Sequence, residues 1–142
     1  MRRRPAVRWS PFALLFLSAA CTGLSAGPEV SASMPVPVSR DSAWVRAKRA
    51  LQAEVFSISG EDSLQGRISA MRYPSTSAKV GTAAACRVQM SLTIGGAPES
   101  AELVSTTRWI APTGMAAHPD VCEEDRQETL DRIALTIAPP AP

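Results

Sequence analysis

The stretch from Cys86 to Ile94 restricts the fold more than any other part of the chain. Apolar residues occupy every second position in it, and Arg, Gln, Ser and Thr fill the positions between them. Successive side chains of a β-strand point to opposite faces, so this alternation predicts a strand with one buried and one solvated face. A strand of this kind belongs to a sheet whose apolar face is covered by a second layer.

Three further segments are predicted strands, because they alternate or are rich in residues that sheets favour: residues 55–59, 65–73 and 101–110. The tripeptide Gly60-Glu61-Asp62 supplies a turn between the first two. Residues 95–99 supply a turn before the last one. We therefore expect two β-hairpins.

Two amphipathic helices are expected at the ends of this series of strands. In residues 42–54, Trp44, Ala47 and Leu51 fall on one helical face. Residues 120–137 carry a second apolar stripe in their last turns. Each apolar face needs a surface to cover, and the apolar face of the sheet provides one.

The second helix is predicted to start with a capping box, with Asp120 as the N-cap residue and Glu123 reaching back to it. The order of elements is then helix, four strands, helix. This order predicts an α+β domain, a two-layer sandwich in which a four-stranded antiparallel sheet carries both helices on one face.

The N-terminal segment has the three parts of a secretory signal peptide. Four arginines and no acidic residue lie within the first eight positions, and a nine-residue apolar run from Phe12 to Ala20 follows. A helix that crosses a bilayer needs about 17 to 25 apolar residues, so this run is too short to span a membrane. We expect residues 1–20 to be a signal peptide that is removed on export.

The end of this segment, Leu17-Ser18-Ala19-Ala20-Cys21, resembles the lipobox of bacterial lipoprotein signal peptides. The resemblance implies that the peptide is cut before Cys21 and that the thiol of this cysteine is acylated. Two or three acyl chains hold a protein stably on a membrane. The residue after the cysteine is Thr22 rather than Asp, which resembles the pattern of lipoproteins sorted to the outer membrane. The resemblance implies an outer-membrane protein that faces the periplasm.

Ser18 departs from the lipobox pattern, because the family usually has Leu three positions before the cysteine. The alternative is cleavage by an ordinary signal peptidase after Ala20 or Ala26. That cleavage would give a soluble protein, secreted or periplasmic.

The rest of the chain divides by composition into three parts. Residues 21–39 begin with the cysteine that the lipobox resemblance implies is lipidated, and their richness in Pro, Gly and small polar residues predicts a flexible linker. Residues 40–138 have the size of one globular domain, and residues 139–142 form a disordered tail. Without the arginines of the signal, 11 basic and 13 acidic residues remain, a balance that argues against nucleic-acid binding.

Cys86 and Cys122, the two cysteines after Cys21, are expected to form a disulfide with each other. An exported protein favours oxidation of its thiols, and the bond would join the last helix to the sheet. Two alternatives stay open. The thiols could be buried separately, or Cys122, near a helix N-terminus, could be a reactive thiol.

Other chemistry-bearing residues are few. His118 is the sole histidine, so no histidine cluster can bind a metal. Glu123, Glu124, Asp125 and Glu128 lack the spacing of a calcium loop and are interpreted as a solvated helix face. No nucleophile elbow, phosphate loop or dinucleotide fingerprint is present. We therefore expect no catalytic residue, no metal ligand and no cofactor.

Several basic and aromatic residues allow two interpretations each. Basic residues of the first helix could contact anionic headgroups or could be an ordinary polar face. Trp109 and Tyr73 could be exposed recognition residues, but aromatic burial favours core or rim positions. The outer face of the sheet is expected to carry Arg67, Arg87 and Gln89.

The order of elements and the turn from Gly60 to Ile68 resemble small domains of bacterial envelope lipoproteins, including those of outer-membrane assembly factors. The resemblance covers residues 42–137 and implies a noncatalytic role with an envelope protein as partner. The first hypothesis is thus an envelope lipoprotein, bound to the membrane through lipid on Cys21, whose domain serves in binding or assembly. The alternative is an exported thiol enzyme or redox protein that uses Cys122.

Overall fold

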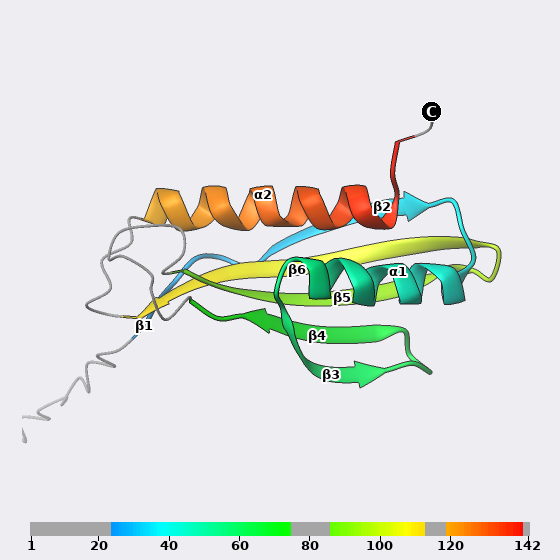
Figure 1. Cartoon of the computed structure of the whole chain (residues 1–142), viewed down its shortest axis with the longest axis horizontal. Coiled ribbons are helices and arrows are strands. Elements are labelled where there is room, and N and C mark those ends of the chain that lie inside the picture. Colours follow the sequence, from blue (N-terminus) through cyan, green and yellow to red (C-terminus); the bar gives the residue numbers. More distant parts are fainter. Residues whose placement is uncertain (1–23, 75–85, 113–118, 141–142) are drawn as a thin grey trace, which may run out of the picture.

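The computed structural model of the chain describes residues 24–74, 86–112 and 119–140. These residues form two layers, a sheet and a pair of helices packed on one of its faces (Figure 1). The α+β class and the antiparallel sheet agree with the prediction. The sheet has six strands rather than the four expected.

The strands pair in the order β1-β6-β5-β4-β3, and β2 also pairs with β6. Both expected hairpins are confirmed, since β3 pairs with β4 and β5 pairs with β6. The strands are β1 (Leu24–Ala26), β2 (Val30–Val36), β3 (Ser57–Asp62), β4 (Arg67–Arg72), β5 (Arg87–Ala97) and β6 (Ser100–Pro112).

The two additional strands lie in the segment that was expected to be a flexible linker. Both run antiparallel to β6, with Leu24 opposite Pro112 and Val36 opposite Ala101. Pro, Gly and Ser are poor strand formers on their own. Here the free edge of β6 supplies the hydrogen-bonding partner that composition could not reveal, and Val36 is fully buried as a result.

The helices are α1 (Arg40–Ala53) and α2 (Pro119–Ile137). The N-cap of α1 is Ser39, whose side-chain oxygen accepts a hydrogen bond from the backbone N–H of Ser42 at 3.2 Å. The helix α2 begins at Pro119, two residues before Val121, the first helical residue expected with Asp120 as N-cap. Asp120 therefore lies in the first helical turn rather than at the N-cap, where its carboxylate still faces the positive end of the helix dipole.

The main core lies between the helices and the inner face of the sheet. Val88, Met90 and Leu92 of β5 are buried at alternate positions, as their spacing predicts. The buried face of α1 is mostly alanine, and small side chains let a helix approach a sheet closely. Within the described ranges, no helix is long and apolar enough to cross a membrane.

Removal of β1 and β2 tests the corrected domain boundary. A chain that begins at Pro37 would lose the pairing along one edge of β6 and expose the side chains under Val36. We expect a loss of several kcal/mol in the free energy of unfolding, measured by urea denaturation against the chain that begins at Thr22. Equal stability of the two chains would show that residues 22–36 act as a linker.

Candidate functional site

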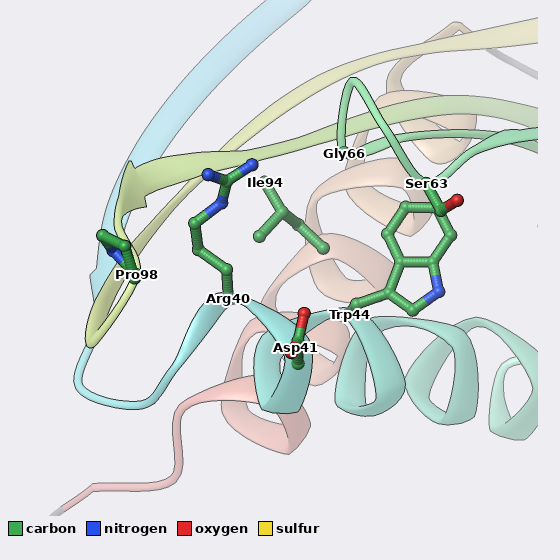
Figure 2. Close-up of a pocket in the computed structure, with 7 residues that line it drawn as sticks. All are labelled: Arg40, Asp41, Trp44, Ser63, Gly66, Ile94 and Pro98. Carbon is green, nitrogen blue, oxygen red and sulfur yellow. The ribbon is translucent and has the colours of Figure 1, made fainter.

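A cavity of about 330 Å³ opens at the end of the molecule where α1 begins. Its walls come from the first turns of α1, the β3–β4 turn, the end of β5 and the β5–β6 turn (Figure 2). The volume is at the lower end of the usual range for small-molecule pockets. The lining residues are Arg40, Asp41, Trp44, Ser63, Gly66, Ile94 and Pro98.

Helical spacing brings three of these residues to the cavity. Positions three and four apart share one helix face, so Trp44 lies one turn beyond Arg40 and Asp41 on the same side of α1. The backbone N–H of Arg40 donates to the carbonyl of Pro98 at 3.0 Å. This bond joins the start of the helix to the β5–β6 turn and fixes the distance across that side of the cavity.

The β3–β4 turn reaches the cavity because of Gly66. Its φ is +66°, a left-handed conformation that glycine adopts without steric cost. The carbonyl of Gly66 accepts a hydrogen bond from the N–H of Ile94 at 2.7 Å. A Cβ at this position would lie 2.2 Å from the Ile94 carbonyl oxygen, so only glycine permits this close approach.

Arg40 and Asp41 bring a positive and a negative group to the cavity. Within the described ranges, neither side chain makes an ion pair or a hydrogen bond. In contrast, Lys48 further along α1 pairs with Glu61 at 3.0 Å. Figure 2 shows Arg40 and Trp44 on either side of Ile94, with Asp41 between them. The cavity thus offers two free charges beside an indole ring and an aliphatic side chain.

A second group of polar residues lies under α2. Arg126 is only 2% exposed, and its Nη1 donates to Thr107 Oγ1 at 2.7 Å while its Nε donates to Glu123 at 3.1 Å. Arg72 pairs with Asp125 and donates to another residue of α2, Thr129, at 2.8 Å. These bonds join α2 to β6 and β4.

The two carboxyls of this group have opposite pKa shifts. The hydrogen bond from Arg126 holds the pKa of Glu123 below its ordinary value, against the effect of burial. Burial raises the pKa of Asp125 above its ordinary value, although the charge of Arg72 acts in the other direction. We assign this group a structural role, because its cations already have partners in the fold.

The predicted disulfide is present. Cys86, just before β5, is bonded to Cys122 in the first turns of α2, with 5.6 Å between their Cα atoms. Both residues are buried and pack with Trp109 and Ala111 in a second, smaller apolar cluster. In this state Cys122 carries no thiol and is closed off from solvent.

Other residues considered from the sequence have varied places in the structure. Trp109 is in the interior, whereas Tyr73 is 58% exposed and lies 5.5 Å from the Arg87 guanidinium. On the outer face of the sheet, Gln89 accepts a hydrogen bond from Arg108. The basic residues of α1 are partly engaged: Arg46 donates to the carbonyl of Ile137, and Lys48 pairs with Glu61.

The acidic residues of α2 do not form a metal site in the described parts of the chain, where no group of three metal-ligating side chains converges. Glu123 and Asp125 instead pair with arginines. Cys21 and His118 lie outside the described residues.

The cavity was not anticipated from the sequence. The sequence predicts Trp44 on the core-facing side of its helix, and Trp44 does contact the main core while also lining the cavity. The sequence predicts Arg40 at the start of the domain and Ser63 within the turn from Gly60 to Ile68. The available signal was the polar, glycine-containing turn from Asp62 to Gly66, since binding residues often lie on loops held by a rigid scaffold.

No protein-family model matches the chain, and a comparison with curated proteins found no match. Solved structures do resemble it. Ara h 8.0201 aligns with a TM-score of 0.56 and 9% identity, covering 80% of this chain and 96% of that one. A norcoclaurine synthase point mutant from Thalictrum flavum, in complex with a transition-state analogue, aligns with a TM-score of 0.51 and 11% identity, covering 81% and 93%.

A third structure is norcoclaurine synthase from Thalictrum flavum in complex with dopamine and hydroxybenzaldehyde. It aligns with a TM-score of 0.50 and 9% identity, covering 96% of this chain and 94% of that one. These neighbours have Bet v 1-like folds. At such low identities the likeness shows the fold alone, and one neighbour being an enzyme does not assign a reaction to this chain.

Reduction of the disulfide is expected to lower stability. The bond joins residues 36 apart, and a loop of that size corresponds to about 3 to 4 kcal/mol in the chain-entropy description. Urea unfolding with and without reductant measures the difference, and the double variant Cys86→Ala, Cys122→Ala should not respond to reductant. A count of two free thiols in the denatured, unreduced wild type would contradict the bond.

The raised pKa of Asp125 gives a second prediction. The folded state binds this proton more tightly than the unfolded chain does, so the carboxyl stabilises the fold at low pH. That contribution is lost as the pH rises through the folded-state value. We therefore expect the unfolding free energy of the wild type, minus that of Asp125→Asn, to fall as the pH rises above 3.8, the ordinary pKa of this carboxyl.

The matched control for this measurement is Asp131→Asn, at an exposed position of the same helix. Urea unfolding at several pH values should give the control a flatter profile than Asp125→Asn. A difference for Asp125→Asn that rises with pH would mean that the ion pair with Arg72 outweighs burial.

Proposed function

We propose that this protein is a bacterial envelope lipoprotein whose domain binds a small ligand without chemical conversion. The cavity beside Arg40, Asp41 and Trp44 is the observation that carries the binding part of the proposal. Converging polar groups beside apolar walls are the usual form of a ligand pocket. The complex of norcoclaurine synthase with dopamine and hydroxybenzaldehyde supports the capacity of this type of fold to hold small molecules.

The proposal of binding without catalysis follows from the chemistry of the cavity lining. Arg40 and Asp41 can orient charged groups, and Ser63 can donate or accept a hydrogen bond. Serine is a weak nucleophile unless an adjacent general base activates it, and among the residues that the structure describes no histidine or cysteine lines this cavity. These groups suit recognition rather than a reaction.

The membrane part of the proposal rests on the signal peptide and on the lipobox resemblance around Cys21. Lipid on this residue would place the domain on an envelope membrane, with the outer membrane facing the periplasm as the expected location. An envelope protein is a further candidate partner. Cleavage by an ordinary signal peptidase would instead leave a soluble periplasmic or secreted binding protein.

The position of β1 limits how far the sheet can lie from a lipid on Cys21. Leu24 already pairs with β6, and only two residues separate it from Cys21. Three residue steps span at most about 11 Å. Acylated Cys21 would therefore hold this end of the sheet close to the bilayer, without the flexible tether that the composition suggested.

The alternative function, a thiol enzyme that uses Cys122, has a structural requirement. The bond to Cys86 would first have to be reduced, and the fully buried Cys122 would have to become accessible. Thiolates act as nucleophiles only when they are accessible.

Replacement of Cys21 tests the anchor. In a bacterial host that processes lipoproteins, the wild type should fractionate with membranes, and its intact mass should equal that of a chain starting at Cys21 plus acyl groups. Cys21→Ser should lose the acyl mass and leave the membrane fraction. Cys122→Ala, which keeps Cys21, should stay with the membranes. A mature wild type that starts at unmodified Cys21, Thr22 or Gly27 would sink the proposed anchor.

A further inference from the structure

The cavity at the start of α1 also indicates the chemical class of its ligand. We infer that it binds a zwitterionic ligand, a free amino acid with an apolar side chain. This inference rests on the proposed function of the cavity as a binding site and goes further by naming what enters it.

The first argument is the pair of free charges. Arg40 and Asp41 are adjacent in sequence and both line the cavity, and within the described ranges neither is neutralised by another side chain. An anion alone would be attracted by Arg40 and repelled by Asp41. A cation alone would be attracted by Asp41 and repelled by Arg40. A ligand with a carboxylate and an ammonium group close together complements both.

The second argument is the geometry of each charged group. A guanidinium presents a planar fork of N–H donors that matches a carboxylate, and the Asp41 carboxylate accepts hydrogen bonds from an ammonium. Ser63, from the β3–β4 turn, lines the cavity beside the Trp44 ring. The cavity therefore holds one side chain that can bind the acid of an amino acid and one that can bind its amine.

The third argument is the apolar part of the lining and its size. Trp44, Ile94 and Pro98 provide an aromatic face, an aliphatic side chain and a ring. Burying apolar ligand surface against such groups adds affinity. A volume of about 330 Å³ leaves room for a small ligand only, which fits an amino acid better than an extended peptide.

Calorimetric titration of the purified, processed protein tests the inference with leucine, methionine and phenylalanine as probes. The amide of each removes the carboxylate, and the N-acetyl form removes the ammonium. We expect at least one free amino acid to bind with Kd at or below about 1 mM, and both of its derivatives to bind at least about tenfold more weakly. No binding of any free amino acid up to about 10 mM would overturn the inference.

Two variants test which charged group of the ligand binds Arg40 and which binds Asp41. In Arg40→Gln the free amino acid and its amide should bind equally, because the partner of the carboxylate is gone. In Asp41→Asn the free and N-acetyl forms should bind equally for the corresponding reason. Arg49→Gln, at an exposed position of the same helix, should keep the wild-type order of affinities. If both cavity variants kept the wild-type preference for the free amino acid over its amide and its N-acetyl form, the assigned roles of Arg40 and Asp41 would be wrong.

The indole N–H resonance of Trp44 separates failure of the inference from failure of the proposed function. Trp44→Phe identifies this signal against that of Trp109. If acetate, phenol or glucose shifts the signal while no amino acid does, the cavity binds ligands but not of this class, and the inference fails alone. If no probe shifts the signal, both fail.

Discussion

The fold depends on backbone hydrogen bonding along both edges of β6. This strand is 13 residues long, with β5 on one side and both β1 and β2 on the other. A strand in this position has few unpaired N–H and C=O groups, and the sheet edges lie elsewhere, at β3 and at the outer sides of β1 and β2. Residues that look like a linker therefore belong to the domain, and the connection from β2 into α1 places the start of that helix beside the β5–β6 turn.

Two kinds of bond hold α2 on the sheet, and they contribute differently. The disulfide at Cys122 restricts the unfolded chain and so adds stability. The ion pairs of Arg72 and Arg126 are partly buried, and Glu123 is 43% exposed. Loss of hydration and solvent screening offset much of their attraction, so they add little net stability. The hydrogen bonds from Arg126 to Thr107 and from Arg72 to Thr129 are directional and fix the position of the helix, because loss of either hydroxyl would leave a guanidinium N–H without this acceptor.

The sequence predicts correctly the elements that are determined by residues close together in the chain. The alternation of β5, the hairpin turns and the two apolar helix stripes all correspond to elements of the structure. The disulfide between Cys86 and Cys122 was predicted because export favours oxidation of thiols and because the positions of both cysteines in their elements could be read from the sequence. In contrast, β1 and β2 form through pairing with a strand about 75 residues away, and no periodicity within residues 24–36 records it. The cavity was missed for the same reason, since Arg40, Ser63 and Pro98 meet only through tertiary structure.

The two ends of β6 also separate the proposed anchor from the proposed binding site. Leu24 pairs at the Pro112 end, whereas the cavity adjoins the β5–β6 turn at the other end. At about 3.3 Å per residue, these ends lie about 40 Å apart. Figure 1 shows β1 and the start of α1 at opposite ends of the sheet. A lipid on Cys21, joined to the sheet by two residues, would therefore point the cavity away from the membrane, where a dissolved ligand could enter it without crossing the headgroup layer.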